Sequence, residues 1–285
     1  MTIGGGSTAV PIVRFVRRLR GGSQPILVQG ADDLFYVAKF KNNLQGPNLL
    51  FNECMGTELF RACGLQVPSW TILNLSKSFL ESNLGSWLET PEGLRRPEEG
   101  LCYATHFLYK KGNKTLEVLP GTFLNRIRNR SLFWLAWLLD ICFEHTDHRQ
   151  AIFQMDERGF LDTFFIDMGN MFGGAKGGQH SHLLASRYLD PRIYPDIGSK
   201  ERTSILKIVG SIDVDGLWHR LEHIPANWRS VTAEESLMQG LNRLGKVKLL
   251  EEILDAMIES QRPRTERYRE LAQTRHAASA VVLYP

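Results

Sequence analysis

Residues 145–174 read HTDHRQAIFQMDERGFLDTFFIDMGNMFGG, and this segment carries the clearest structural signal in the chain. Two short apolar runs, AIFQM and TFFI, flank the turn sequence DERG and predict a β-hairpin. Asp147 precedes the hairpin and Asp167 follows it, so both carboxylates are expected at its open end. Either aspartate alone is more typical of a turn or a helix cap. Two carboxylates that lie close together would suit Mg²⁺, which prefers hard oxygen ligands together with phosphate.

The segment before the hairpin predicts a buried helix. LFWLAWLLDICF (Leu132–Phe143) is apolar nearly all round, as expected for a helix at the centre of a domain. It is too short to span a bilayer and it contains Asp140. Further along, VKLLEEILDAMIES predicts an amphipathic helix, and Thr232 with Glu235 predicts a capping box at the start of another. The chain beyond Lys110 is therefore expected to be mainly helical.

The first third of the chain is β-rich in pattern. IVRFVRRL, PILVQG and LFYVAKF are separated by turn sequences and predict an antiparallel meander, and TILNL and LCYATHFLY predict further strands. Residues Asn48–Cys63 have helical spacing, and Gly64 predicts the helix end. Ser76–Gly100 is expected to be a loop or a ragged hairpin. The pattern predicts an α+β protein of two lobes, residues 1–109 and 110–285.

The composition limits the possible partners. The net charge of +3 is too small to indicate nucleic-acid binding. The four cysteines form no CxxC pair, which argues against a zinc ribbon or a disulfide framework and fits reduced thiols in a cytosol. The first residues, MTIGGGSTAVPIV, lack the pattern of a signal peptide. We therefore expect a cytoplasmic protein with no membrane and no direct nucleic-acid partner.

Two features of the first lobe could bind phosphate. The sequence GGSQP lies between two predicted strands, so the backbone of Gly22, Ser23 and Gln24 could close over a phosphate, although a plain hairpin turn has the same pattern. Lys39 lies near the end of a predicted strand. If it faces the interior it needs an anionic partner, for which Glu53 on the following helix is a candidate. If it lies at a sheet edge, it points to water.

The order of these residues is that of protein kinases: a glycine turn, a strand lysine, a helix glutamate, a loop aspartate and an aspartate after a hairpin. More narrowly, the sequence resembles the HipA-like kinase family, especially its bacterial branch. The matching pieces are GGSQPILV, YVAKFKNNLQGPNLLFNE, GLQVP, TDHRQAIF and FIDMGNMFGG. The resemblance implies a bilobed protein-kinase-like fold, with an antiparallel β N-lobe and a mainly helical C-lobe, that binds ATP and Mg²⁺.

The resemblance also implies roles for individual residues. Lys39 would hold the α- and β-phosphates of ATP, and Glu53 would orient Lys39. Asp147 would be the catalytic base, and Asp167 would bind the metal. The glycine loop, Gly22, Ser23 and Gln24, would cover the phosphates. The hinge beside adenine would be formed by Thr105, His106 and Phe107.

One departure from the kinase pattern concerns the metal. Kinases have an asparagine five residues after the catalytic aspartate, and this position is Ile152 here, which cannot coordinate a metal. The amide oxygen of Gln150 could replace it at the catalytic centre if the loop is shorter. Arg149 could either steady a phosphate or stay in solvent.

Two functions follow. One is a kinase that transfers the γ-phosphoryl group of ATP to a hydroxyl, of the Ser/Thr type or on a small molecule, with Ser23 of the chain itself among the possible acceptors. The other is a catalytically silent kinase-like module that binds nucleotide or a partner. If the protein is a kinase, the glycine-rich segment after Asp167 would contain substrate contacts, for which Lys176, His180 and His182 are candidates.

Histidine-based metal sites are the remaining alternatives. An iron site would use the H-x-D pattern HTD, but that pattern is usual on a β-strand and here it follows an apolar helix. A zinc pair of His145 and His148 lacks a further ligand motif nearby. For the iron site, the second histidine, in addition to the HTD pattern, would be His180, His182, His219 or His223.

Overall fold

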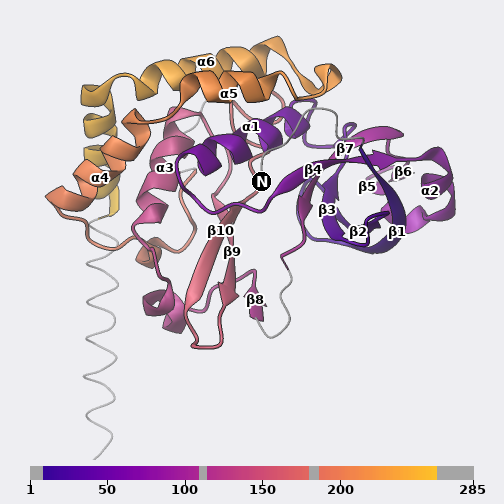
Figure 1. Ribbon diagram of the computed structural model, residues 1–285, viewed down its shortest axis with the longest axis horizontal. Helices are drawn as coiled ribbons and strands as arrows, with labels where there is room; N and C mark the ends of the chain where they lie inside the picture. The colour runs from indigo at the N-terminus through magenta and orange to yellow at the C-terminus, as the bar shows by residue number, and fades with distance from the viewer. Residues whose placement is uncertain (1–8, 109–113, 180–185, 262–285) are drawn as a thin grey trace, which may run out of the picture.

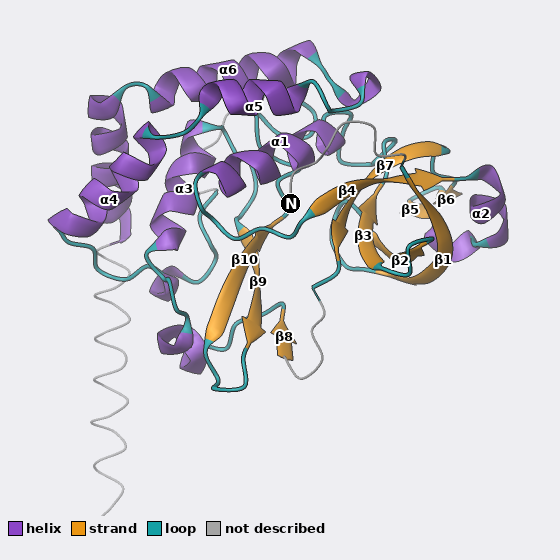
Figure 2. Cartoon of the chain, in the orientation of Figure 1, coloured by secondary structure: helices purple, strands orange, loops and turns teal. Residues whose placement is uncertain are grey.

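The computed structural model describes residues 9–108, 114–179 and 186–261. Strands form one end of the molecule and helices cover the other, with a small sheet below them (Figure 1, Figure 2). The β-rich first part and the helical second part agree with the predicted α+β class. The predicted division at residues 109–110 and the C-terminal residues 262–285 lie outside the described residues, as do His180 and His182.

The N-lobe is a closed barrel with the strand order β1-β2-β3-β7-β4. β1 to β3 form the predicted antiparallel meander, and β7 lies between β3 and β4. The barrel closes through a short parallel pairing of Val10 with Leu73 and Pro11 with Asn74, which the sequence pattern did not predict. The barrel strands are β1 (Val10–Arg18), β2 (Ile26–Gly30), β3 (Phe35–Lys39), β4 (Trp70–Leu75) and β7 (Gly100–His106).

The segment between β4 and β7 is more ordered than the predicted loop. It begins with a short helix that is capped by Ser76, whose side chain accepts from the N–H of Phe79 at 3.1 Å. A hairpin follows, so the expectation of a ragged hairpin holds for its second half. Its elements are α2 (Lys77–Ser82), η1 (Leu84–Ser86), β5 (Leu88–Thr90) and β6 (Gly93–Arg95).

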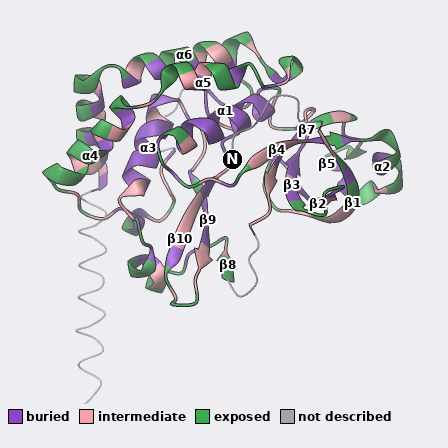
Figure 3. Cartoon of the chain, viewed as in Figure 1, coloured by how far each residue is buried: buried purple, intermediate pink, exposed green. Residues whose placement is uncertain are grey.

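Helix α1 (Leu49–Ala62) lies between the barrel and the C-lobe (Figure 1). Every residue from Leu49 to Phe60 is buried, including polar ones, so the helix is packed on all sides (Figure 3). The predicted helix end is at Gly64, whose φ of +73° is a conformation that glycine adopts without strain. α1 is therefore a wall shared by both lobes.

The C-lobe is built around α3 (Leu132–Cys142), the predicted central helix. Phe133 packs edge-on against Phe165 with ring centroids 5.0 Å apart, which joins the helix to a sheet of order β10-β9-β8. The predicted hairpin is β9 and β10. The lobe contains β8 (Lys114–Leu116), η2 (Gly121–Arg126), β9 (Gln150–Met155), β10 (Leu161–Ile166), η3 (Pro191–Ile193), α4 (Ser199–Gly210), α5 (Val214–Leu221), η4 (Ala226–Trp228), α6 (Val231–Leu244) and a further helix over 247–261.

One predicted helix start is wrong. The cap of α6 is Ser230, which has extended backbone and accepts from the N–H of Ala233 at 3.2 Å. Thr232 and Glu235 therefore lie inside the helix rather than forming its capping box. Among the described residues, no helix has the length and apolar character needed to cross a bilayer.

Candidate active site

Three charged side chains from three distant elements meet between the lobes. Lys39 ends β3, Glu53 lies in the middle of α1, and Asp167 follows β10. The Lys39 Nζ lies 2.8 Å from Asp167 Oδ1 and also contacts Glu53 Oε1. Lys39 is only 8% exposed, which excludes the alternative of an edge lysine pointing to water.

The charges of this group stabilise one another. Burial disfavours the charged form of Lys39, but the carboxylates of Asp167 and Glu53 outweigh it and raise the pKa of the ammonium. Burial likewise opposes ionisation of Asp167, yet the Lys39 ammonium lowers its pKa to about 2. For Glu53, burial raises the pKa more than Lys39 lowers it. Lys39 is therefore cationic and Asp167 anionic at neutral pH.

Asp167 has an unusual backbone conformation. Its φ of +61° is in the left-handed region, which costs a non-glycine residue about 1–3 kcal/mol and is common at functional sites. Its second carboxylate oxygen, Oδ2, accepts from Gln150 Nε2 at 2.8 Å. Ile152, the position of the kinase asparagine by counting, lies within β9 opposite Phe164. The loop before β9 is thus short, and it is Gln150 that reaches the aspartate.

Asp147 lies in that loop and is partly exposed. Its Oδ1 accepts from the N–H of His148 at 2.7 Å. The loop is held on both sides, because Thr146 N–H donates to the Asn170 carbonyl at 2.9 Å and His148 Nδ1 lies 3.3 Å from the Arg187 carbonyl. Asp147 therefore lies in a loop that hydrogen bonds hold in place, and the residue is partly exposed to water.

The neighbouring His145 and Arg149 turn inward. His145 is fully buried, and burial lowers its pKa well below its usual range, so it is neutral. Arg149 is 2% exposed and donates from Nε to Asp140 Oδ2 at 2.8 Å. Both expectations for Arg149, a phosphate contact or a solvent position, are wrong. The signal missed in the sequence is Asp140, a lone carboxylate in an apolar helix that needs a cationic partner.

The glycine turn is tied to its surroundings. The N–H of Gln24 donates to the Gly21 carbonyl at 3.0 Å, and the Gln24 side chain forms two hydrogen bonds with the backbone of Glu89, of 2.8 and 2.7 Å. Ser23 is buried, and its carbonyl accepts from Asn43. The backbone N–H of Gln24 is therefore not free for a phosphate, and a backbone contact from this turn would come from Gly22 and Ser23.

The three predicted hinge residues lie at the end of β7. Thr105 pairs with Val37 of β3 and with β4. The N–H of His106 donates to the Ser69 carbonyl and that of Phe107 to the Phe35 carbonyl, each at 2.8 Å. The backbone donors of these two residues are thus used within the barrel. A base near this end of β7 would therefore meet no free backbone N–H of His106 or Phe107.

The donors near Asp167 fit a magnesium ion that is shared with phosphates. Mg²⁺ usually takes one or two protein carboxylates and completes its shell with water and phosphate oxygens. The Asp167 carboxylate and the Gln150 amide supply hard oxygens of this kind, and the orientation of an amide can reverse. Within the described ranges, no group of three or more His, Cys, Asp or Glu side chains could hold a metal alone.

The other candidate residues do not join this group. His219 and His223 pack against each other with ring centroids 5.3 Å apart, on α5 and just after it. Lys176 is exposed. The four cysteines are free and buried: Cys54, Cys63, Cys102 and Cys142.

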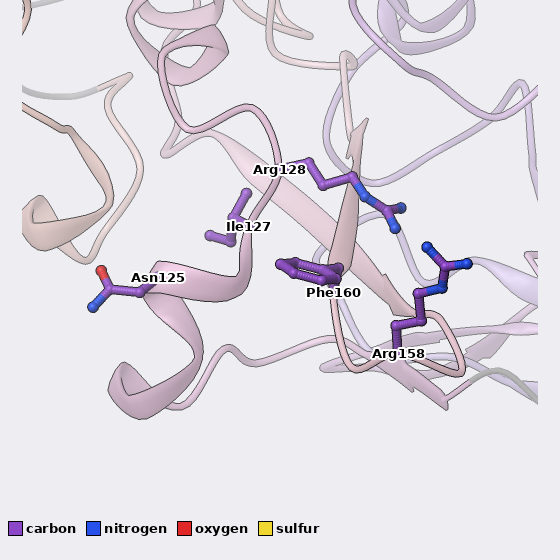
Figure 4. A pocket seen from close by; sticks show the side chains of 5 residues that line it. All are labelled: Asn125, Ile127, Arg128, Arg158 and Phe160. Carbon is purple, nitrogen blue, oxygen red and sulfur yellow. The ribbon is translucent and has the colours of Figure 1, made fainter.

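A surface hollow of about 480 Å³ lies around the β9–β10 turn and the segment that follows η2 (Figure 4). It has no carboxylate in its lining, and Arg128 is already paired with Asp156 and Asp162. It therefore offers no carboxylate that could act as a base or bind a metal, and the charged group around Asp167 remains the candidate active site. The hollow is lined by Asn125, Ile127, Arg128, Arg158 and Phe160.

No protein-family model and no curated protein matches the sequence. Among solved structures, a Golgi casein kinase has a TM-score of 0.51 at 14% identity, covering 88% of this chain and 74% of its own. The same kinase with Mn/ADP bound has a TM-score of 0.50 at 15% identity, with the same coverage. The Helicobacter pylori proinflammatory kinase CtkA has a TM-score of 0.48 at 11% identity, covering 85% and 95%. The likeness to the casein kinase confirms the kinase-like fold.

Proposed function

We propose that this chain is a kinase that transfers a phosphoryl group from ATP and requires a divalent metal. The observation that carries the proposal is the meeting of Lys39, Glu53 and Asp167 from three elements of a kinase-like fold. A folded scaffold has no need to bury two carboxylates against one ammonium. A site that binds the phosphates of a nucleotide uses all three.

The residues have distinct roles in this mechanism. Asp147 orients the acceptor hydroxyl and takes its proton as the γ-phosphoryl group moves in line. Lys39 places a positive charge at the phosphates, where negative charge is redistributed in the transition state. Asp167 and Gln150 would hold the metal, which when bound neutralises phosphate charge. Glu53 keeps Lys39 in place.

The finer assignments belong to the same proposal. We assign Mg²⁺ as the metal because the ligands are oxygens, and a protein Ser or Thr hydroxyl as the acceptor because of the HipA-like resemblance. The backbone of Gly22 and Ser23 would contact the phosphates. The edge of the barrel at Thr105 to Phe107 would lie beside the base.

A silent nucleotide-binding module is the second candidate. The observation in its favour is Ile152, which lies in β9 against Phe164 and leaves the loop without the asparagine that serves a second metal in kinases. A module of this kind would bind nucleotide through the same lysine and aspartate. It would transfer no phosphate.

The first experiment measures the thermal unfolding midpoint with and without ATP, each with and without Mg²⁺. Ligand at about a hundred times its Kd adds roughly 2.7 kcal/mol of stability, so a rise with ATP and a further rise with Mg²⁺ supports the site. No shift under either condition would refute it.

The second experiment separates the two candidates by following radiolabel from γ-labelled ATP into protein or inorganic phosphate. Asp147→Asn should keep the ATP-dependent shift and lose turnover. Asp162→Asn is the matched control, because Asp162 pairs with Arg128 on the surface. Turnover by Asp147→Asn at the wild-type rate would exclude Asp147 as the base, and no turnover by the wild type with any tested acceptor would favour the silent module.

A further inference from the structure

The backbone around Asp167 is held by Arg149 on one side. Arg149 Nη1 donates to the Ile166 carbonyl at 2.9 Å and lies 3.4 Å from the Asp167 carbonyl. The same guanidinium binds both carboxylate oxygens of Asp140 on α3, with Nε 2.8 Å from Oδ2. It also lies over the ring of Phe60 on α1, 4.8 Å from the centroid. Arg149 is therefore fixed by α3 and α1 while it contacts the carbonyls at Asp167.

Glu53 holds the backbone on the other side. The N–H of Gly169 donates to Glu53 Oε1 at 3.0 Å, and the N–H of Met168 lies 3.3 Å from Oε2. Ile166 and Asp167 thus present their carbonyls to a cation, and the next two residues present their N–H groups to an anion. Both charged side chains are buried.

We propose that Arg149 is a positioning residue for the metal site. Together with Glu53 it forms a two-sided clamp that keeps Asp167 in its left-handed conformation, with φ at +61°, so that its carboxylate faces Lys39 and Gln150. The inference rests on the proposed function and extends it to a residue that touches neither nucleotide nor metal.

The shape of arginine is essential to this role. A guanidinium has donors on two edges of a rigid plane, so one edge can bind Asp140 while the other meets the carbonyls. A lysine ammonium at this position could keep the charge pair but could not hold both partners in one fixed geometry. Arg149→Lys is therefore the sharpest variant, because it preserves the charge and removes the fork.

The test measures binding of Mn²⁺ in the presence of ADP by the electron paramagnetic resonance of free Mn²⁺, and binding of ADP alone by calorimetry. Replacing a residue that orients a metal ligand typically lowers metal affinity by about 10- to 100-fold. We expect Arg149→Lys to weaken Mn²⁺ binding by about that factor, while ADP binding without metal stays close to that of the wild type. Arg128→Met, which removes a surface arginine paired with Asp156 and Asp162, should change neither.

A second variant keeps the test valid if Arg149→Lys does not fold. The pair Asp140→Leu with Arg149→Met replaces a buried ion pair by apolar side chains, a change that folded proteins often tolerate. It should show the same selective loss of Mn²⁺ affinity. Wild-type Mn²⁺ affinity in a folded variant overturns the clamp, as does a loss of ADP affinity without metal that is as large as the loss of Mn²⁺ affinity. If the wild type binds no Mn²⁺ with ADP, the proposed function fails and the clamp fails with it.

Discussion

The buried carboxylate of Glu58 fixes α1 to both lobes, and replacing it by alanine should destabilise the protein measurably. Glu58 Oε1 accepts from Trp70 Nε1 of β4 at 2.7 Å, and the carboxylate also pairs with Arg61 on α1 and Arg220 on α5. Its side chain is 3% exposed. These contacts join the barrel, the shared helix and the C-lobe through a single acid.

The size of this destabilisation follows from the fact that Glu58 is buried while both of its arginine partners are partly exposed. Breaking a buried ion pair by removing one partner costs about 3–5 kcal/mol. The side chains of Arg220 and Arg61 are 48% and 35% exposed, so water can solvate both after the change. We therefore expect about 3 kcal/mol for Glu58→Ala, the low end of that range. Glu58→Gln keeps an acceptor for Trp70 and should cost about half as much.

Urea unfolding followed by tryptophan fluorescence and far-UV circular dichroism measures this change, provided that the slope of free energy against urea is unaltered. Glu81→Ala is the matched control, because Glu81 is exposed and faces Lys77 at 3.9 Å on α2, a pair that should contribute less than about 1 kcal/mol. If Glu58→Ala unfolds at the same urea concentration as Glu81→Ala, the claim that Glu58 joins the lobes is wrong.

Three further predictions concern the site and its supports. Lys39→Met leaves two carboxylates without their cation, so it should lower the unfolding free energy by about 3 kcal/mol and abolish the ATP-induced rise in midpoint; an intact rise would show that Lys39 does not bind phosphate. His145 has a pKa lowered by burial from 6.5, so below that pH the unfolded chain takes up a proton that the folded chain does not. As the pH is lowered below 6.5, the unfolding free energy of the wild type should therefore fall relative to that of His145→Gln by up to about 1.4 kcal/mol per pH unit. Parallel plots of unfolding free energy against pH for the two proteins would disprove this. Gly56→Ala would place a Cβ 2.6 Å from Met168 Cβ, so it should cost about 1–3 kcal/mol and weaken metal-dependent ATP binding, whereas Gly210→Ala, with open space around it, should cost nothing measurable.

Local patterns in the sequence predicted the elements well, because a helix and a hairpin each pair most of their backbone groups with residues close by in the sequence. The apolar runs around DERG became β9 and β10, and the all-round apolar segment became α3 at the centre of the C-lobe. The closing of the barrel could not be predicted this way. It depends on two parallel pairings between β1 and β4, which are some sixty residues apart and carry no distinctive residue type.

The site residues were predictable where a charge needs a partner and unpredictable where only geometry decides. Lys39 required an anion once it faced inward, and Glu53 was the nearest acid on a buried helix. For Arg149 the signal was indirect, because Asp140 in its apolar helix needs a cation, but which cation reaches it depends on how many residues the loop contains before β9 begins. The same count placed Gln150, rather than Ile152, beside Asp167.

α1 is joined to the C-lobe through polar side chains on more than one of its faces. Glu53 and Glu58 are five residues apart, which turns them by about 140° around the helix axis, so Glu53 faces the candidate active site and Glu58 faces α5. Asn52, the residue before Glu53, donates from Nδ2 to the Gly169 and Met171 carbonyls at 2.9 and 2.7 Å. A helix bound at so many points to the C-lobe cannot swing away as a unit without exposing buried charge. Displacing α1 would therefore break the contacts of Glu53 with Lys39 and with the N–H groups of Met168 and Gly169.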